Sequence, residues 1–230
     1  ELLAEVREAG LLDNTIVIFY SDHGGPLPRG KRELYDSGLK VPMIIRFPDG
    51  KWAGSTVDEL VSFVDIPAGI LSLAGIDPPE YMHGQAFVGD YAEEPRIYIY
   101  GARDRMDGQY DVRRAVRDRH FKYIRNYRPE VGCYLDIQFR KQLASMQELL
   151  RLRDAGKLNE DQMYWFREEK AEEELYDLRN DPHELHNLAG DPAYESDLIR
   201  LRKEHEKWLA EVGDNPEMSE KELVWSMWPG

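Results

Sequence analysis

The chain has 230 residues, of which 30 are Lys or Arg and 44 are Asp or Glu, so its formal net charge is −14 at pH 7. A protein this acidic is not a general ligand of nucleic acids or anionic membranes, because both carry the same sign of charge. Apolar residues make up 42% of the chain, which indicates a globular fold with a sizeable core. No apolar run is long enough to predict a membrane span, and the single cysteine excludes an internal disulfide framework.

The first 95 residues show the alternation of helices and strands that is typical of α/β folds. In chain order, the pattern predicts a helix, two strands and a second helix, over Glu1–Ala9, Thr15–Tyr20, Val41–Phe47 and Asp65–Ala74. The first strand is a β-branched and aromatic run, typical of a strand buried on both faces in a parallel sheet. Pro48-Asp49-Gly50 is a turn signal, and Gly75 ends the second helix.

From Arg96 the pattern changes to short β-branched and aromatic runs separated by polar turns. It predicts four strands, over Arg96–Tyr100, Val112–Arg117, Phe121–Asn126 and Glu174–Leu178. A helical insertion is expected over about 128–172, and a last helix over Tyr194–Val212 carries an apolar stripe. These features predict a core domain over 1–95 and a smaller α+β subdomain over 96–230. The apolar tail, with Trp225, Met227 and Trp228, is expected to dock on the protein.

The most informative segment follows the first strand. Asp22 and His23 stand at the carboxyl end of that strand, where open α/β sheets place their ligands. Gly24 and Gly30 allow close backbone approach, so Lys31 can fold over the same crevice. The segment therefore predicts a site for a metal and an anion. The alternative is an ordinary turn at the end of a strand.

Asp22–Pro42 closely resembles the metal- and sulfate-binding segment of the type I sulfatases, members of the alkaline phosphatase superfamily. Three further segments resemble the same family in the same order: Val64–Ile76, Arg114–Ile124 and Glu174–Leu188. The match thus covers nearly the whole chain. The resemblance implies an α/β fold: part of an alkaline-phosphatase-like central mixed sheet flanked by helices, followed by a smaller α+β subdomain with an antiparallel sheet.

The family's nucleophile is absent from this chain. Sulfatases make a formylglycine from Cys or Ser in the pattern C-x-[P/S]-x-R near the N-terminus, with paired aspartate metal ligands further upstream. Cys133 has neither the Pro or Ser nor the Arg of that pattern, and a packing role is favoured. The chain also begins without methionine, inside a predicted helix. We therefore interpret it as the C-terminal part of a larger sulfatase.

The resemblance assigns roles to three residues of the segment. Asp22 is expected to ligate a metal, Ca²⁺ with Mg²⁺ as the alternative, since both prefer oxygen ligands. His23 stands where most relatives have Asn; it is expected to ligate the metal, to donate a hydrogen bond to the sulfate, or to be structural only. Lys31 matches the lysine that contacts the sulfate and the leaving oxygen, with a solvated loop lysine as the alternative. Lys31 and His23 are the catalytic candidates.

Weaker candidates for substrate binding are Arg29, Arg103, Arg105 and His83. Arg29 flanks Lys31 and could add positive potential. Arg103 and Arg105 are expected in a loop at a strand end, where they could bind a sugar carboxylate or a second sulfate, or pair with neighbouring acids. His83 could reach the cleft or pack in its loop. The Arg103 loop and the insertion resemble the heparan N-sulfatase-like branch of bacterial sulfatases.

The leading hypothesis is a sulfuric ester hydrolase that acts on a sulfated sugar or glycosaminoglycan fragment. Its partners are that carbohydrate and the missing N-terminal half, so the chain alone is expected to be inactive. The resemblance also implies a periplasmic or secreted bacterial protein. The alternatives are a phosphodiesterase or phosphonate monoester hydrolase of the same superfamily, and a binding module without catalysis.

Overall fold

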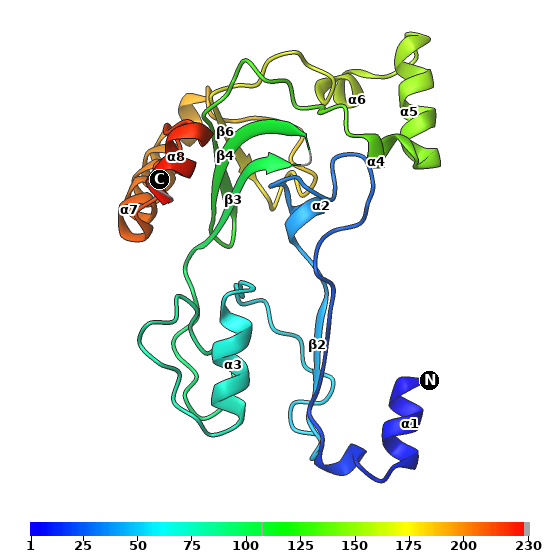
Figure 1. Cartoon of the computed structure of the whole chain (residues 1–230), viewed down its shortest axis with the longest axis vertical. Coiled ribbons are helices and arrows are strands. Elements are labelled where there is room, and N and C mark those ends of the chain that lie inside the picture. The colour runs from blue at the N-terminus through cyan, green and yellow to red at the C-terminus, as the bar shows by residue number, and fades with distance from the viewer. Residues whose placement is uncertain (107, 228–230) are drawn as a thin grey trace.

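The computed structural model describes residues 1–106 and 108–227 (Figure 1). Its helices are α1 Leu2–Glu8, α2 Asp36–Leu39, α3 Asp65–Leu73, α4 Gln138–Lys141, α5 Ala144–Asp154, α6 Glu160–Tyr164, α7 Glu195–Val212 and α8 Glu220–Met227, with 3-10 turns at Leu12–Asn14 and Pro192–Tyr194. Its strands are β1 Val17–Tyr20, β2 Met43–Arg46, β3 Ile99–Met106, β4 Gln109–Arg117, β5 Phe121–Asn126 and β6 Glu173–Asp177. Within these described residues, no helix is both long enough and apolar enough to cross a membrane.

The strands form two separate sheets. β1 and β2 make a two-stranded ribbon, and β3 to β6 make a four-stranded antiparallel sheet in chain order. Figure 1 shows the ribbon and α3 in one part of the molecule and the larger sheet in the other, with α7 and α8 on one side of it and α4 to α6 on the other. The predicted four short strands and long terminal helix are confirmed. The domain boundary near residue 95 stays a prediction.

The expectation of a buried parallel strand after Thr15 was wrong for the described residues. β1 pairs antiparallel with β2, from Val17 opposite Arg46 to Tyr20 opposite Met43. Phe19 is 61% exposed and Ile44 is 62% exposed. The composition of the segment predicted a strand correctly. Composition carries no information about which strand pairs with β1. The bare apolar surface is of the kind that a larger sheet would cover.

The four-stranded sheet has a core on each face. On one face, Val116, Tyr123 and Leu175 pack against Leu198 and Leu201 of α7. On the other face, the neighbouring residues Ala115, Ile124 and Tyr176 pack against Leu34 and Tyr35, which lie between β1 and β2. Successive strand residues point to opposite faces, so each strand contributes to both cores. The segment that carries the candidate site is therefore packed on the sheet rather than free in solvent.

The helical insertion has its own small core. Cys133 packs with Met146 and Trp165, and burial raises the pKa of its thiol. The predicted packing role of Cys133 is confirmed. The insertion contains the helices α4, α5 and α6, and α6 ends at Tyr164, just before Trp165, which packs in this core.

The tail was expected to dock through its apolar side chains, and the described part of it does not. Trp225 and Met227 of α8 are exposed. A polar contact links this helix to β3 instead: Arg105 Nε lies 2.5 Å from Glu220 Oε1. Trp228 lies outside the described residues.

His205 of α7 is a buried imidazole that the fold keeps neutral. Its ring packs against those of Tyr123 and Tyr127, with centroids 5.5 and 6.1 Å away. Burial, together with the positive charges of Arg125 and Arg114, lowers the pKa of His205 from 6.5 to about 4. Between these two values the unfolded chain binds a proton that the folded chain excludes, so stability falls as the pH is lowered.

Replacing His205 by Phe is expected to remove this acid sensitivity, because the phenyl ring keeps the packing and binds no proton. Thermal unfolding measured from pH 6.5 to pH 4 should show a shallower fall in melting temperature for His205→Phe than for the wild type. His186→Gln, at an exposed histidine, is the matched control and should follow the wild type. An unchanged slope in His205→Phe would refute the assignment.

Candidate active site

Residues 21–42, the site loop, connect β1 to β2. The loop leaves the carboxyl end of β1, and α2 forms part of it (Figure 1). Leu34 and Tyr35 anchor its middle in the core beneath the four-stranded sheet. The Tyr35 hydroxyl donates a hydrogen bond of 2.8 Å to the buried carboxylate of Glu174. These contacts fix the loop relative to the sheet.

Glycines let the site loop fold back on itself. The Gly24 amide donates a hydrogen bond of 2.9 Å to the Gly38 carbonyl. A Cβ atom at Gly24 would lie 1.9 Å from the Ser37 carbonyl oxygen, and one at Gly38 would lie 2.3 Å from the Glu33 carbonyl oxygen. No side chain fits at either position, so the predicted close approach of the backbone is confirmed.

Lys31 sits in a strained part of the site loop. Its amide donates a hydrogen bond of 2.9 Å to the Gly25 carbonyl. Arg29 and Arg32, on either side, have φ angles of 58° and 77°, in the left-handed region that non-glycine residues rarely occupy. Strain of this kind persists only where the surroundings over-determine the backbone, and it clusters at functional sites.

Asp22 and His23 form a pair at the start of the loop. The Asp22 side chain is 82% exposed, and its Oδ2 lies 3.3 Å from His23 Nε2. His23 Nδ1 lies 2.8 Å from the Gly24 carbonyl oxygen, which can only accept, so Nδ1 carries a proton. Nε2 and the carboxylate then face each other. A backbone carbonyl that holds the far ring nitrogen is typical of metal-ligating histidines.

The Lys31 side chain lies beside the helical insertion. Its Nζ is 5.4 Å from the ring centroid of Phe139 in α4. The neighbouring Arg140 is buried and donates from Nη2 to the Lys31 carbonyl oxygen over 3.2 Å. The insertion therefore touches both the backbone and the side chain of Lys31.

Asp36, at the start of α2, ties the far end of the loop to the sheet. Lys122 Nζ lies 2.6 Å from Asp36 Oδ1, and Arg117 Nε lies 3.1 Å from it. Burial opposes ionisation of Asp36, but these two cations outweigh it and lower the pKa of the carboxyl group. Lys122 also pairs with the buried Glu184 at 2.7 Å, and burial raises the pKa of Glu184. These contacts give this end of the loop a structural role.

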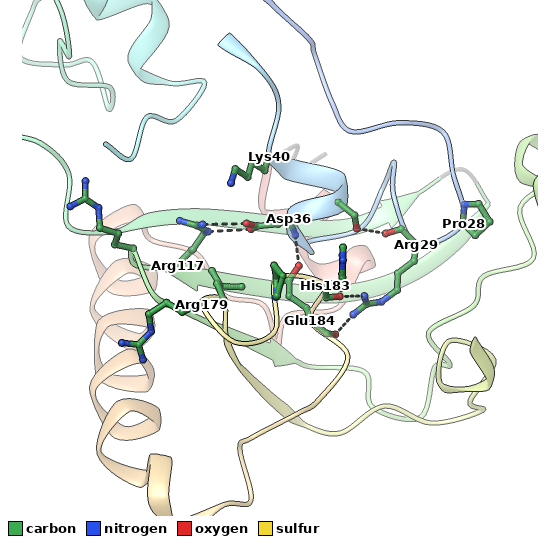
Figure 2. A pocket seen from close by; sticks show the side chains of 12 residues that line it. Pro28, Arg29, Asp36, Lys40, Arg117, Arg179, His183 and Glu184 are labelled. Atoms are coloured by element: carbon green, nitrogen blue, oxygen red, sulfur yellow. Dashed lines mark hydrogen bonds and ion pairs between the residues drawn. The ribbon is translucent and has the colours of Figure 1, made fainter. Parts of the chain in front are cut away.

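Arg29 lines a surface pocket that does not include Lys31. Its guanidinium donates to the carbonyl oxygens of His183 and Glu184 and lies over the Tyr35 ring, 3.8 Å from the centroid. Figure 2 shows the contacts of Arg29 with His183 and Glu184. The pocket, of about 560 Å³, is lined by the cations Arg29, Lys40, Arg117, Arg119 and Arg179. It includes none of Asp22, His23 and Lys31, so Arg29 is not brought to the candidate site.

The two arginines expected in a loop at a strand end lie inside β3, which corrects that expectation. Arg103 is buried, with Nη1 2.6 Å from Glu33 Oε2 and Nη2 3.2 Å from Asp111 Oδ2. This is the ion-pair alternative of the prediction, and it leaves no face of Arg103 open to a substrate. Arg105 is exposed and paired with Glu220. The strand continues past Tyr100 because β4 supplies hydrogen-bonding partners that local sequence does not reveal.

His83 is exposed in the loop after α3. Its carbonyl oxygen accepts a hydrogen bond of 3.2 Å from Arg96, and the same guanidinium pairs with the buried Asp65 at 2.5 Å. These contacts fix the backbone at His83. They do not bring its imidazole to Asp22 or Lys31.

Comparison with known proteins shows the family of this chain. The sulfatase family model matches residues 1–76, which include the whole site loop. An ulvan-active sulfatase of Formosa agariphila is 55% identical over 229 residues, which cover 100% of this chain and 38% of that protein. The chain belongs to the sulfatase family. Human N-sulphoglucosamine sulphohydrolase is 31% identical over 93% of the chain and 45% of its own length.

Solved structures agree on the fold of this sulfatase chain. The protein BT4656, solved in complex with D-glucosamine-2-N,6-O-disulfate, superposes with a TM-score of 0.68 at 23% identity, over 95% of this chain and 39% of that one. The predicted α/β fold class, with a smaller antiparallel sheet, is confirmed. The chain spans about two fifths of the length of the curated relatives it matches, from 38% to 45% in the two above.

The donor set of the site loop fits a hard cation in part. Asp22 offers an exposed carboxylate and His23 a ring nitrogen beside it. Residues 1–106 and 108–227 contain no group of three or more His, Cys, Asp or Glu side chains that could hold a metal ion. Because Ca²⁺ takes six to eight oxygen ligands, most of a calcium shell would have to come from outside these residues.

Sequence reasoning missed the buried charges beneath Lys31 in this sulfatase chain. Glu33 Oε2 lies 2.6 Å from Arg103 and 3.3 Å from Arg113, and its Oε1 lies 2.5 Å from Arg140. All four side chains are buried. They join the site loop, the sheet and the insertion. The one available signal was the high density of charge in strands that otherwise read as apolar.

Proposed function

We propose that this chain is part of a sulfuric ester hydrolase that acts on a sulfated sugar or glycosaminoglycan fragment. The observation that carries the proposal is the site loop, which bears Asp22, His23 and Lys31. Its backbone folds closely on itself at glycines, and it lies within the part matched to the sulfatase family. The relatives support the substrate class, since one is named for activity on ulvan and another for N-sulphoglucosamine.

Each residue of the loop has a proposed role. Lys31 donates to the oxygen that leaves with the sugar, and its point charge offsets the charge that develops there. The carboxylate of Asp22 and Nε2 of His23 would hold a divalent metal ion, while the Gly24 carbonyl orients the imidazole. Hydrolysis breaks the ester bond to sulfur, so that water supplies the new oxygen of the sulfate and a proton restores the sugar hydroxyl.

Two groups outside the described residues complete this proposal. Formylglycine would supply the nucleophile, and Ca²⁺, with Mg²⁺ as the alternative, would neutralise the sulfate oxygens. We place the formylglycine and the paired aspartates in the part of the protein that this chain does not span, because the chain covers 38% of the ulvan-active relative. The chain alone is then inactive. We also propose a periplasmic or secreted location in a bacterium.

The decisive experiment is an assay of the complete protein. Release of inorganic sulfate from ulvan oligosaccharides or N-sulfoglucosamine supports the proposal. Hydrolysis of a phosphonate monoester or phosphodiester, with sulfate esters untouched, would favour the related hydrolases instead. Absence of hydrolysis with retained binding of the sulfated sugar would favour a binding module.

Replacing Asp22 by Asn in the complete protein is expected to lower the bound metal content, because a charged ligand becomes neutral while its size is kept. Elemental analysis of the purified variant measures this directly. Asp13→Asn, at an exposed acid ahead of β1, is the matched control and should retain the metal. Equal metal content in Asp22→Asn and the wild type would remove Asp22 from the metal site.

A further inference from the structure

Helix α4 of the insertion is fastened to the site loop by Arg140. The guanidinium is buried, with Nη2 at 2.5 Å from Glu33 Oε1 and at 3.2 Å from the Lys31 carbonyl oxygen. It also lies over the Trp165 ring, 5.2 Å from the centroid, in the insertion's own core. Because one side chain binds both segments, the position of α4 relative to Lys31 is fixed.

The residue before Arg140 faces outward from the same junction. Consecutive residues of a helix lie about 100° apart, so with Arg140 turned inward Phe139 is turned towards the surface. Phe139 is 41% exposed. Its ring centroid is 5.4 Å from Lys31 Nζ and 5.1 Å from the Arg32 guanidinium carbon. A partly exposed aromatic ring thus has two cations of the site loop over its face.

This combination matches the chemistry of a sulfated pyranose. One face of such a ring carries C–H groups that pack on an aromatic face, whose quadrupole is negative. The sulfate substituent is an anion and pairs with lysine or arginine. A ligand that has both an apolar ring face and an anionic group can therefore pack on Phe139 and pair with Lys31 at the same time. In a chain of net charge −14, attraction of an anion must come from such a local cluster.

We propose that Phe139 is a sugar-binding residue: its ring packs against the pyranose whose sulfate group lies at Lys31, so that the helical insertion sets substrate specificity. This inference rests on the proposed function. Arg140 acts as a positioning residue, since it holds α4 against Lys31 and does not itself face the surface. The ligand class is a sulfated hexopyranose, as opposed to a linear alkyl sulfate or free sulfate.

The test compares Phe139→Leu with the wild type in the complete protein, with ulvan oligosaccharides as substrate and inorganic sulfate as competitive inhibitor. Loss of the aromatic face is expected to raise KM about tenfold, with a smaller effect on kcat. The inhibition constant of inorganic sulfate should stay the same, since sulfate has no ring to pack. Phe139→Tyr keeps the aromatic face and should restore the wild-type KM.

Tyr91 is the matched control, because it is also an aromatic residue with 41% exposure. Tyr91→Leu should leave KM unchanged. If Phe139→Leu binds the oligosaccharide as the wild type does, or if Phe139→Tyr fails to restore KM, the inference is overturned while the proposed function stands. If the wild type releases no sulfate from any sulfated sugar, the proposed function itself fails.

Discussion

Replacing Lys31 by Ala in the complete protein is expected to lower kcat for a sulfate ester by ~10²–10³-fold, the cost of removing one group that stabilises transition-state charge. The Lys31 amide is held to the Gly25 carbonyl through the backbone, so the loop should keep its fold without the side chain. Steady-state release of sulfate measures the effect. The larger change should fall on kcat, since the charge on the leaving oxygen develops only in the transition state.

Lys40→Ala is the matched control for this prediction. Lys40 lies near the end of the same loop but lines the separate pocket beside α2 (Figure 2). Its removal should leave kcat unchanged. Turnover of Lys31→Ala within a factor of two of the wild type would show that Lys31 is a solvated loop lysine.

The second large effect is expected for Glu33→Gln, which keeps the shape of the side chain and removes its charge. Arg103, Arg113 and Arg140 all contact this carboxylate in the interior. Breaking a buried ion pair from one side leaves uncompensated charge and costs ~3–5 kcal/mol of stability. The loss of charge compensation should be largest at Arg140, because its other hydrogen-bonding partner is a neutral carbonyl. The melting temperature of the complete protein measures the loss.

Glu172→Gln provides the comparison on the surface. Glu172 pairs with Arg125 at 3.3 Å, with 68% of its side chain exposed. Exposed pairs are worth ~0–1 kcal/mol, so this variant should unfold close to the wild type. If Glu33→Gln also has the melting temperature of the wild type, the buried network does not hold the site loop in place.

The sequence predicted those parts of the fold that depend on local pattern. The strands β4 to β6 and the helix α7 appear close to their expected bounds, because alternation, helical spacing and turn residues act over a few positions. The partner of β1 could not be predicted in this way. Its antiparallel pairing with β2 depends on the path of the loop between them.

The candidate site also has parts that local sequence predicts and parts that depend on tertiary packing. Asp22, His23 and Lys31 are close in sequence, and their spacing together with the glycines was enough to bring them into one segment. Arg140 lies 109 residues from Lys31, and only tertiary packing brings α4 to the loop. Buried charges were missed because hydropathy treats Glu33 and Arg113 as surface residues, whereas mutual pairing lets them remain inside.

Alternation along β4 also makes the geometry of the site sensitive to strand registry. Ala115 faces the loop that carries Lys31, and Val116, the very next residue, faces α7. A slip of one position in β4 would exchange these two side chains and would disturb both cores at once. Insertion of a single residue into this strand would therefore damage the candidate site as severely as a substitution within it, although β4 carries none of the proposed catalytic groups.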